Sequence, residues 1–127
     1  MRYFKDSEFK KDPDKVALFL KKAMDDLRHL SKVPIHIHVA WSDSGHSKKS
    51  YHYKGMAVDF HFGGSLSMLE QFAFIRALPE LKGIGFYPWW HSPGWHVDLR
   101  GTNLFWVSPE PGKYIYSVED LMKELTR

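Results

Sequence analysis

The stretch Ser50-Tyr-His-Tyr-Lys-Gly-Met-Ala-Val-Asp-Phe60 contains a turn, the start of a strand and two residue types that bind metals. Gly55 can adopt backbone angles that other residues resist, so it predicts a turn. After this turn, the alternation from Met56 to Phe62 predicts a half-buried strand with an apolar face and with Asp59 on the other face. A loop residue, His52, and a strand residue, Asp59, can therefore point toward one spot.

A second segment far downstream, Trp95-His-Val-Asp98, supplies another histidine, His96. Two imidazoles and one carboxylate form the ligand set of a catalytic zinc site, which keeps its fourth position open for water. Ala57 lies on the same predicted face as Asp59, and its small side chain leaves room beside a metal. A histidine seven positions before an aspartate also occurs by chance, so an α+β domain without a metal remains an alternative.

Composition limits the class of protein. A chain of 127 residues can build one hydrophobic core, so residues 1–127 are expected to form a single domain. The absence of cysteine excludes disulfides and thiolate metal sites, which leaves histidine and carboxylate as ligands. Lysine and arginine (18) exceed aspartate and glutamate (15), which favours an anionic neighbour only weakly. The sequence has no clustered basic helix of the kind that binds nucleic acid, so we expect no nucleic-acid partner. We also expect a monomer.

The N-terminal residues and the hydropathy of the chain bear on its location. The N-terminal residues lack the apolar run of a signal peptide, and no stretch is apolar and long enough to span a membrane. We therefore expect a protein that is cytoplasmic as synthesised and has no membrane partner.

The remaining sequence predicts helices and strands in alternation. Asp12-Pro13 is typical of a helix start, and the apolar spacing that follows predicts a helix over 13–30. Two capping pairs predict the starts of later helices: Ser67 with Glu70, and Ser117 with Asp120. Strands are expected at 35–41, 84–87, 95–99, 104–107 and 113–116. This order predicts an α+β fold with a mostly antiparallel sheet flanked by helices.

The motif Ser50-x-His52-x-x-Gly55-x-Ala57-x-Asp59, with Gly83-Ile-Gly-Phe-Tyr-Pro88 and Trp95-His96-Val-Asp98-x-Arg100, resembles the M15 zinc peptidases. That family includes D-Ala-D-Ala carboxypeptidases, murein endopeptidases and phage L-alanyl-D-glutamate endolysins, and it shares its fold with the hedgehog signalling domain. The resemblance covers the chain from Tyr3 to about Val107.

The resemblance implies a hedgehog-like fold and a zinc ion bound by His52, Asp59 and His96. It implies a zinc metallopeptidase that hydrolyses a peptide bond in the stem or cross-link peptides of peptidoglycan, as a carboxypeptidase or an endopeptidase. The missing signal peptide fits a phage or prophage lysin that acts on the cell wall after release, or a cytoplasmic tail-associated protein.

Two departures from the family pattern bear on activity. Many members carry an acid three residues before the last histidine as the general base, and here that position is Pro93. Many also have an arginine in the loop before the motif, whereas residues 41–49 contain none and offer Lys48 and Lys49 instead. An alternative function is therefore a catalytically inactive zinc-binding module that binds a cell-wall peptide or a protein partner.

Three residues are candidates for moving the proton in place of the missing acid: Asp98, His91 and His46. The alternative role of Asp98 is to orient a ligand imidazole, a common arrangement around metal sites. Expected substrate contacts come from Ser50, Tyr87, Trp90 and Trp95. The tryptophans have an equally good alternative role as buried core residues.

Three other histidines share the polar faces of the predicted strands. His36 and His38 are expected to be partly exposed sheet residues. His61 lies two positions after Asp59 on the same face, so it is a candidate for supporting a ligand without binding the metal itself.

Overall fold

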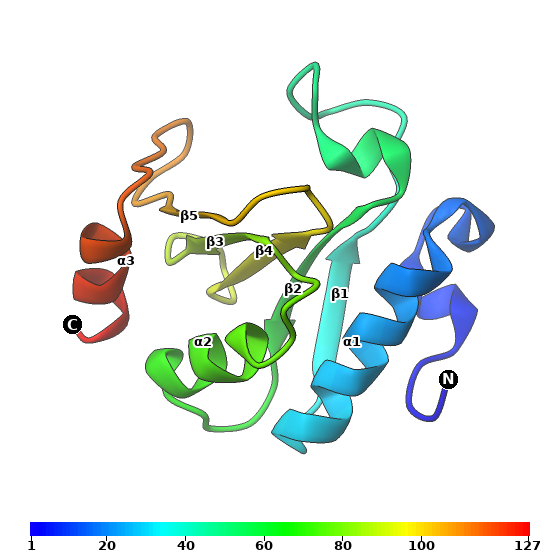
Figure 1. Ribbon diagram of the computed structural model, residues 1–127, viewed down its shortest axis with the longest axis horizontal. Helices are drawn as coiled ribbons and strands as arrows, with labels where there is room; N and C mark the ends of the chain where they lie inside the picture. The colour runs from blue at the N-terminus through cyan, green and yellow to red at the C-terminus, as the bar shows by residue number, and fades with distance from the viewer.

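Five strands form one sheet in the computed structural model, which describes every residue from 1 to 127 (Figure 1). The strands are β1 (Ile35–Val39), β2 (Ala57–Phe62), β3 (Gly83–Tyr87), β4 (Gly94–Asp98) and β5 (Leu104–Val107). Their spatial order is β1-β2-β4-β3-β5, and neighbours pair antiparallel except β3 and β5, which are parallel. The predicted α+β class with a mostly antiparallel sheet is confirmed.

Three α-helices accompany the sheet: α1 (Leu18–Ser31), α2 (Met68–Arg76) and α3 (Val118–Leu125). The predicted caps are confirmed, because the hydroxyl of Ser67 accepts the Glu70 N–H and that of Ser117 accepts the Asp120 N–H. The longest helix, α1, has 14 residues, and none of the three combines the length and apolar character that a membrane crossing requires.

The predicted helix over 13–30 is corrected at its start. Residues Pro13–Lys15 form a short 3-10 helix, η2, and Val16 is extended with φ −84° and ψ 130°, so α1 begins at Leu18. Asp12 lies in the left-handed region and its side chain caps nothing. Two further 3-10 helices, η1 (Asp6–Phe9) and η3 (Tyr51–Lys54), precede α1 and β2.

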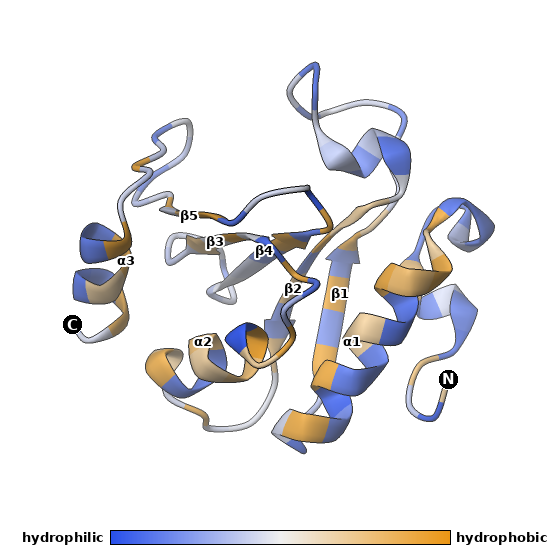
Figure 2. Ribbon diagram, in the orientation of Figure 1, coloured by the Kyte–Doolittle hydropathy of each residue, from blue (hydrophilic) through white to orange (hydrophobic).

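The two faces of the sheet differ in chemistry, as period-two alternation requires. One face joins the helices in a single hydrophobic core that includes Leu20 and Leu27 of α1, Val58 and Phe60 of β2, and Ile84 of β3. Figure 2 shows α1 and α3 banded in orange and blue, the pattern of helices that bury one side. The other face carries the polar residues, so the candidate site lies on the side away from the helices.

The connection from β4 to β5 passes around the start of β3. Residues 99–103 leave β4 at Asp98 and enter β5 at Leu104, and these two residues flank Gly83 on opposite sides. The backbone of Lys82 fixes the crossing, because its N–H donates to the Asp98 carbonyl (3.0 Å) and its carbonyl accepts the Leu104 N–H (2.9 Å). β5 is therefore placed beside β3 rather than beside the strand that precedes it.

Candidate metal centre

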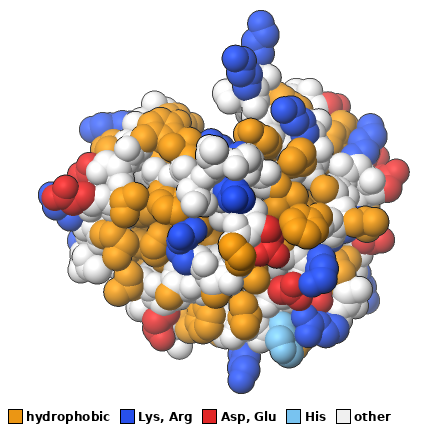
Figure 3. Space-filling model, in the orientation of Figure 1, with side chains coloured by type: hydrophobic (Ala, Val, Ile, Leu, Met, Phe, Trp, Pro, Cys, Tyr) orange, Lys and Arg blue, Asp and Glu red, His pale blue; other side chains and the backbone are white.

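A cavity of about 960 Å³ opens on the polar face of the sheet. One wall is the loop and 3-10 helix from 45 to 54, which rises at the top of Figure 1, and the other is aromatic. Figure 3 shows a hollow at the upper edge of the molecule beside projecting Lys or Arg side chains. Asp59 and His96 lie among the lining residues together with His52.

Hydrogen bonds fix both the backbone and the ring of His52. The hydroxyl of Ser50 accepts the His52 backbone N–H (3.1 Å) and begins η3, and Gly55 ends η3 with φ 66°, as the predicted turn requires. The His52 Nδ1 donates to the Ala40 carbonyl oxygen at 2.7 Å. Because that bond places the proton on Nδ1, the lone pair of Nε2 points to Asp59 Oδ1, 3.1 Å away.

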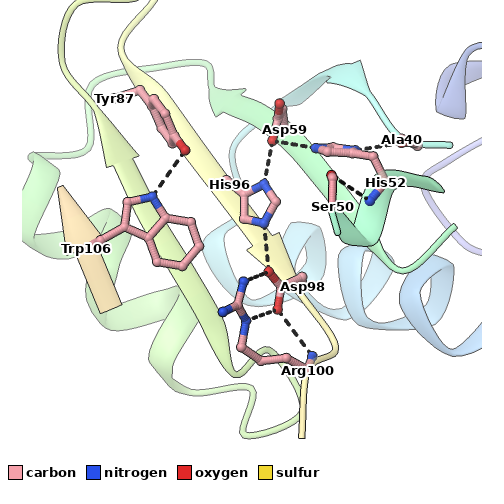
Figure 4. Close-up of polar contacts among 9 residues, drawn as sticks. All are labelled: Ala40, Ser50, His52, Asp59, Tyr87, His96, Asp98, Arg100 and Trp106. Atoms are coloured by element: carbon pink, nitrogen blue, oxygen red, sulfur yellow. Dashed lines mark hydrogen bonds and ion pairs between the residues drawn. The ribbon is translucent and has the colours of Figure 1, made fainter. Parts of the chain in front are cut away.

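His96 reaches the same carboxylate through strand pairing. Asp59 and His96 are direct partners in the β2–β4 register, so their side chains stand side by side on one face. The His96 Nδ1 lies 2.9 Å from Asp59 Oδ1, and its Nε2 lies 2.7 Å from Asp98 Oδ2 (Figure 4). The Asp98 carboxylate therefore holds the Nε2 proton and leaves Nδ1 as the nitrogen that faces Asp59.

Asp98 is fully buried, and both of its oxygens are occupied. Arg100 donates from Nε to Oδ1 (2.8 Å) and from Nη2 to Oδ2 (2.7 Å), while Oδ2 also receives His96. Burial acts to raise the pKa of Asp98, but the Arg100 and His96 bonds outweigh it and hold that pKa well below its usual range. Asp98 does not line the cavity, so this geometry favours the orienting role over that of a proton acceptor.

The convergence of His52, Asp59 and His96 fits a metal ion. Their donor atoms lie within 4.8 Å of one another, and both imidazoles direct a nitrogen at the same carboxylate oxygen. Burial acts to raise the pKa of Asp59, but the adjacent imidazoles of His52 and His96 keep it far below its usual value. The pKa of His96 is about 9, because Asp59 and Asp98 outweigh the effect of burial. A cation is therefore favoured at this point, and the three residues can hold a metal ion.

His46 lies against the centre although it is not one of the three donors. Its ring stacks on His52 with centroids 4.2 Å apart and planes 22° apart, and it lines the cavity. The Tyr53 phenol donates to the His46 carbonyl (2.7 Å) and accepts the His46 N–H (2.9 Å), so one side chain holds both backbone groups. Burial and the neighbouring His52 lower the pKa of His46, which favours its neutral form.

The other predicted site residues divide into two groups. Ser50, Tyr87 and Trp90 line the cavity, and burial raises the pKa of Tyr87, so its phenol keeps its proton. The prediction for Trp95 is corrected, because it is completely buried in the core and its Nε1 donates to Gln71 Oε1 (2.9 Å). His91 is exposed and does not line the cavity.

The aromatic wall contains residues that the sequence did not single out. Trp106 of β5 packs against His96 with ring centroids 5.3 Å apart, and its Nε1 donates to the Tyr87 hydroxyl at 3.1 Å. Gly85 lies opposite His96 in β3, and a Cβ at Gly85 would collide with the Trp106 indole. Tyr114 and Tyr116 complete this wall.

Charge in the cavity is almost entirely positive. Lys48, Lys49 and Lys54 line it, and none of them forms an ion pair, whereas Asp59 is the one acidic residue of the lining. Opposite charge attracts ligands into such a concave site. The cavity is therefore suited to a ligand that carries negative charge.

Comparison with known proteins gives no relative. No protein-family model, no curated protein and no solved structure matches this chain. The likeness to the M15 peptidases, and with it the hedgehog-like fold, stays a prediction that depends on the sequence motifs alone.

Proposed function

We propose that this protein is a zinc metallopeptidase that hydrolyses a peptide bond in the stem or cross-link peptides of peptidoglycan. The observation that carries the proposal is the convergence of His52, Asp59 and His96 at one side of an open, positively charged cavity. Two imidazole nitrogens and one carboxylate oxygen are the donor set of catalytic zinc sites. The sequence motif around these residues supplies the peptidase assignment.

Zinc in such a site lowers the pKa of water to about 7 and polarises a carbonyl group. The protein's own part is to keep both imidazoles in the ligand tautomer, which the Ala40 carbonyl does for His52 and Asp98 does for His96. Arg100 in turn holds Asp98 with two hydrogen bonds, so the carboxylate cannot rotate away. This arrangement keeps the donors in place before any ligand arrives.

His46 is the best placed of the three candidates for moving a proton. It lines the cavity, stacks on a metal ligand and has a lowered pKa, so its imidazole is neutral and able to accept a proton at neutral pH. Asp98 is saturated by its own partners, and His91 lies outside the cavity. In the proposed reaction His46 takes a proton from the attacking water and delivers it to the leaving amine.

The lysines of the loop give the proposed substrate its position. Lys48 and Lys49 replace the arginine that many M15 members carry, and as free cations beside the metal centre they attract a peptide carboxylate. The Tyr87 phenol on the opposite wall can donate a hydrogen bond to a carbonyl of the peptide.

One observation favours a second candidate function, a zinc-binding module without hydrolysis. Pro93 stands where an acid is expected, and the cavity lining contains no carboxylate except the proposed ligand Asp59. In this case the cavity would bind a cell-wall peptide or a protein partner and leave it intact.

Digestion of purified muropeptides separates the two functions. The zinc-loaded protein is incubated with muropeptides from about pH 5 to pH 9, and new free amines are followed by mass spectrometry. The variants are His52→Ala, which removes a proposed ligand, and His29→Ala, which removes an exposed histidine of α1 bonded to Tyr3.

Cleavage that persists in His29→Ala and disappears in His52→Ala or with a chelator supports the peptidase. Stoichiometric zinc without cleavage at any pH in that range supports the binding module. A protein that binds no zinc contradicts both functions.

A further inference from the structure

Three histidines form a separate group on the same face of the sheet. His36 and His38 come from β1 and His61 from β2, and none of them lines the cavity. His36 and His38 are exposed and His61 is half-buried. The β1–β2 register shifts between Ile37 and Val39, so His38 lies at an irregularity of the ladder.

The rings of this group are in direct contact. The His38 Nε2 lies 2.6 Å from the His61 Nδ1, which brings two imidazole nitrogens from different strands to one point. His36 stacks on His61, with centroids 4.8 Å apart and planes 26° apart. Trp90 lies against His38 at 5.3 Å and so closes the other end of the row. The four rings form one row, and the two nitrogens meet at the contact between His38 and His61.

We propose that His38 and His61 form a second metal site, which binds a divalent transition metal such as Zn²⁺ or Ni²⁺ at the surface of the sheet. Imidazole nitrogen is a preferred ligand of these metals and a poor one for Ca²⁺ or Mg²⁺. The remaining positions of the metal are open to solvent or to a ligand, because the His38 ring is exposed and the His61 ring is only half-buried.

The geometry requires only a small adjustment. With metal–nitrogen bonds of about 2.0–2.1 Å, two ligands of a tetrahedral ion lie roughly 3.3 Å apart. The nitrogens of His38 and His61 are closer than this, because they share a hydrogen bond. Rotation of two side chains on the solvent side of the sheet provides the extra separation without movement of the backbone.

The second site is expected to be weaker than the first and to be independent of it. It has two protein donors, and the carboxylate of Asp59 belongs to the group with His52 and His96. Removing a ligand of one site therefore leaves the other site occupied.

Equilibrium dialysis against excess Zn²⁺, with metal and protein measured in each sample, tests the inference. Wild-type protein is expected to hold two zinc ions per chain, and His61→Ala and His38→Ala are each expected to hold one. His96→Ala is also expected to hold one, and His29→Ala, the control for an exposed histidine outside both groups, is expected to hold two.

A second measurement locates the metal without a substitution. Ni²⁺ added to wild-type protein that carries one zinc ion per chain, at the first centre, is expected to broaden the ring-proton NMR signals of His38 and His61 before those of His29 and His91. Equal broadening of all exposed histidines, or a stoichiometry that His61→Ala and His38→Ala do not lower, would overturn the second site. If His96→Ala lowers the zinc stoichiometry and neither histidine variant of the second site does, the second site is overturned and the proposed function stays intact.

Discussion

The two histidine groups on this sheet show that a metal centre depends on what lies behind its imidazoles. In the group of His52 and His96, each ring is fixed from behind, by the Ala40 carbonyl and by the Asp98 carboxylate, and both face Asp59. In the group of His38 and His61, the rings bond to one another and are supported only by stacking. The first group is pre-arranged as a ligand set, and the second must rearrange before it can bind.

Removing the carboxylate from the first group should have the largest effect. Asp59→Asn leaves His52 and His96 as a pair without a shared negative charge, as in the second group. We expect zinc affinity at the first centre to fall by more than about 100-fold, because even partners behind a ligand contribute about 10–100-fold. Isothermal titration of zinc into Asp59→Asn and wild type measures the change.

Asp14→Asn is the matched control for that substitution, since Asp14 is exposed and forms no hydrogen bond or ion pair from its side chain. Unchanged affinity in Asp59→Asn, with a folded protein by circular dichroism, would show that Asp59 is not a ligand.

Removing the support behind His96 should have the next largest effect. In Asp98→Asn the amide no longer neutralises Arg100 and no longer fixes the Nε2 proton of His96 with a charged partner. We expect zinc affinity to fall about 10–100-fold while one zinc still binds at saturation. Titration with zinc gives both numbers, and a loss of stoichiometry instead of affinity would assign Asp98 to the ligand set itself.

A larger side chain at Gly85, beside the first group, should lower the stability of the folded protein. A methyl group at Gly85 would force the Trp106 indole out of its place beside His96, so Gly85→Ala is expected to reduce the free energy of unfolding by about 1–3 kcal/mol. Gly101→Ala is the control, because a Cβ there meets nothing within 4 Å. Urea denaturation compares the two variants, and equal stability would mean that Trp106 is not tightly packed.

Removing the hydrogen bonds that hold the His46 backbone should have the smallest effect on the metal centre. Tyr53→Phe removes the phenol that binds both backbone groups of His46, and each hydrogen bond contributes about 0.5–1.5 kcal/mol. We expect the backbone NMR signals of residues 43–48 to shift and muropeptide cleavage to fall several-fold, with zinc affinity unchanged. Tyr3→Phe, which removes an exposed hydroxyl that bonds to His29 and lies outside the cavity, serves as the control. A change of zinc affinity in Tyr53→Phe would contradict this assignment.

Local patterns in the sequence predicted the elements that depend on neighbouring residues. The alternation around Asp59 and the capping pairs at Ser67 and Ser117 are confirmed. The predicted start of α1 is wrong, because Asp12-Pro13 is also compatible with a 3-10 turn. Contacts from elsewhere in the chain decide whether an α-helix or a 3-10 helix forms there.

The error at Trp95 has a simple physical cause. Adjacent residues of a strand face opposite sides, so Trp95 has to face the core once His96 faces the cavity. The position of Trp106 could not be read in the same way. It depends on the parallel pairing of β5 with β3, which brings Trp106 opposite Gly85, and no local pattern encodes that pairing.

The crossing of residues 99–103 past Lys82 separates the metal ligands from the aromatic wall along the chain. β5 occupies the outer edge of β3, opposite the edge that pairs with β4, and the Lys82 backbone bonds to both neighbours. The ligands His52, Asp59 and His96 all come before this crossing, whereas Trp106, Tyr114 and Tyr116 come after it. Substitutions beyond residue 103 can therefore reshape the wall that meets a ligand while every donor atom of the centre stays the same.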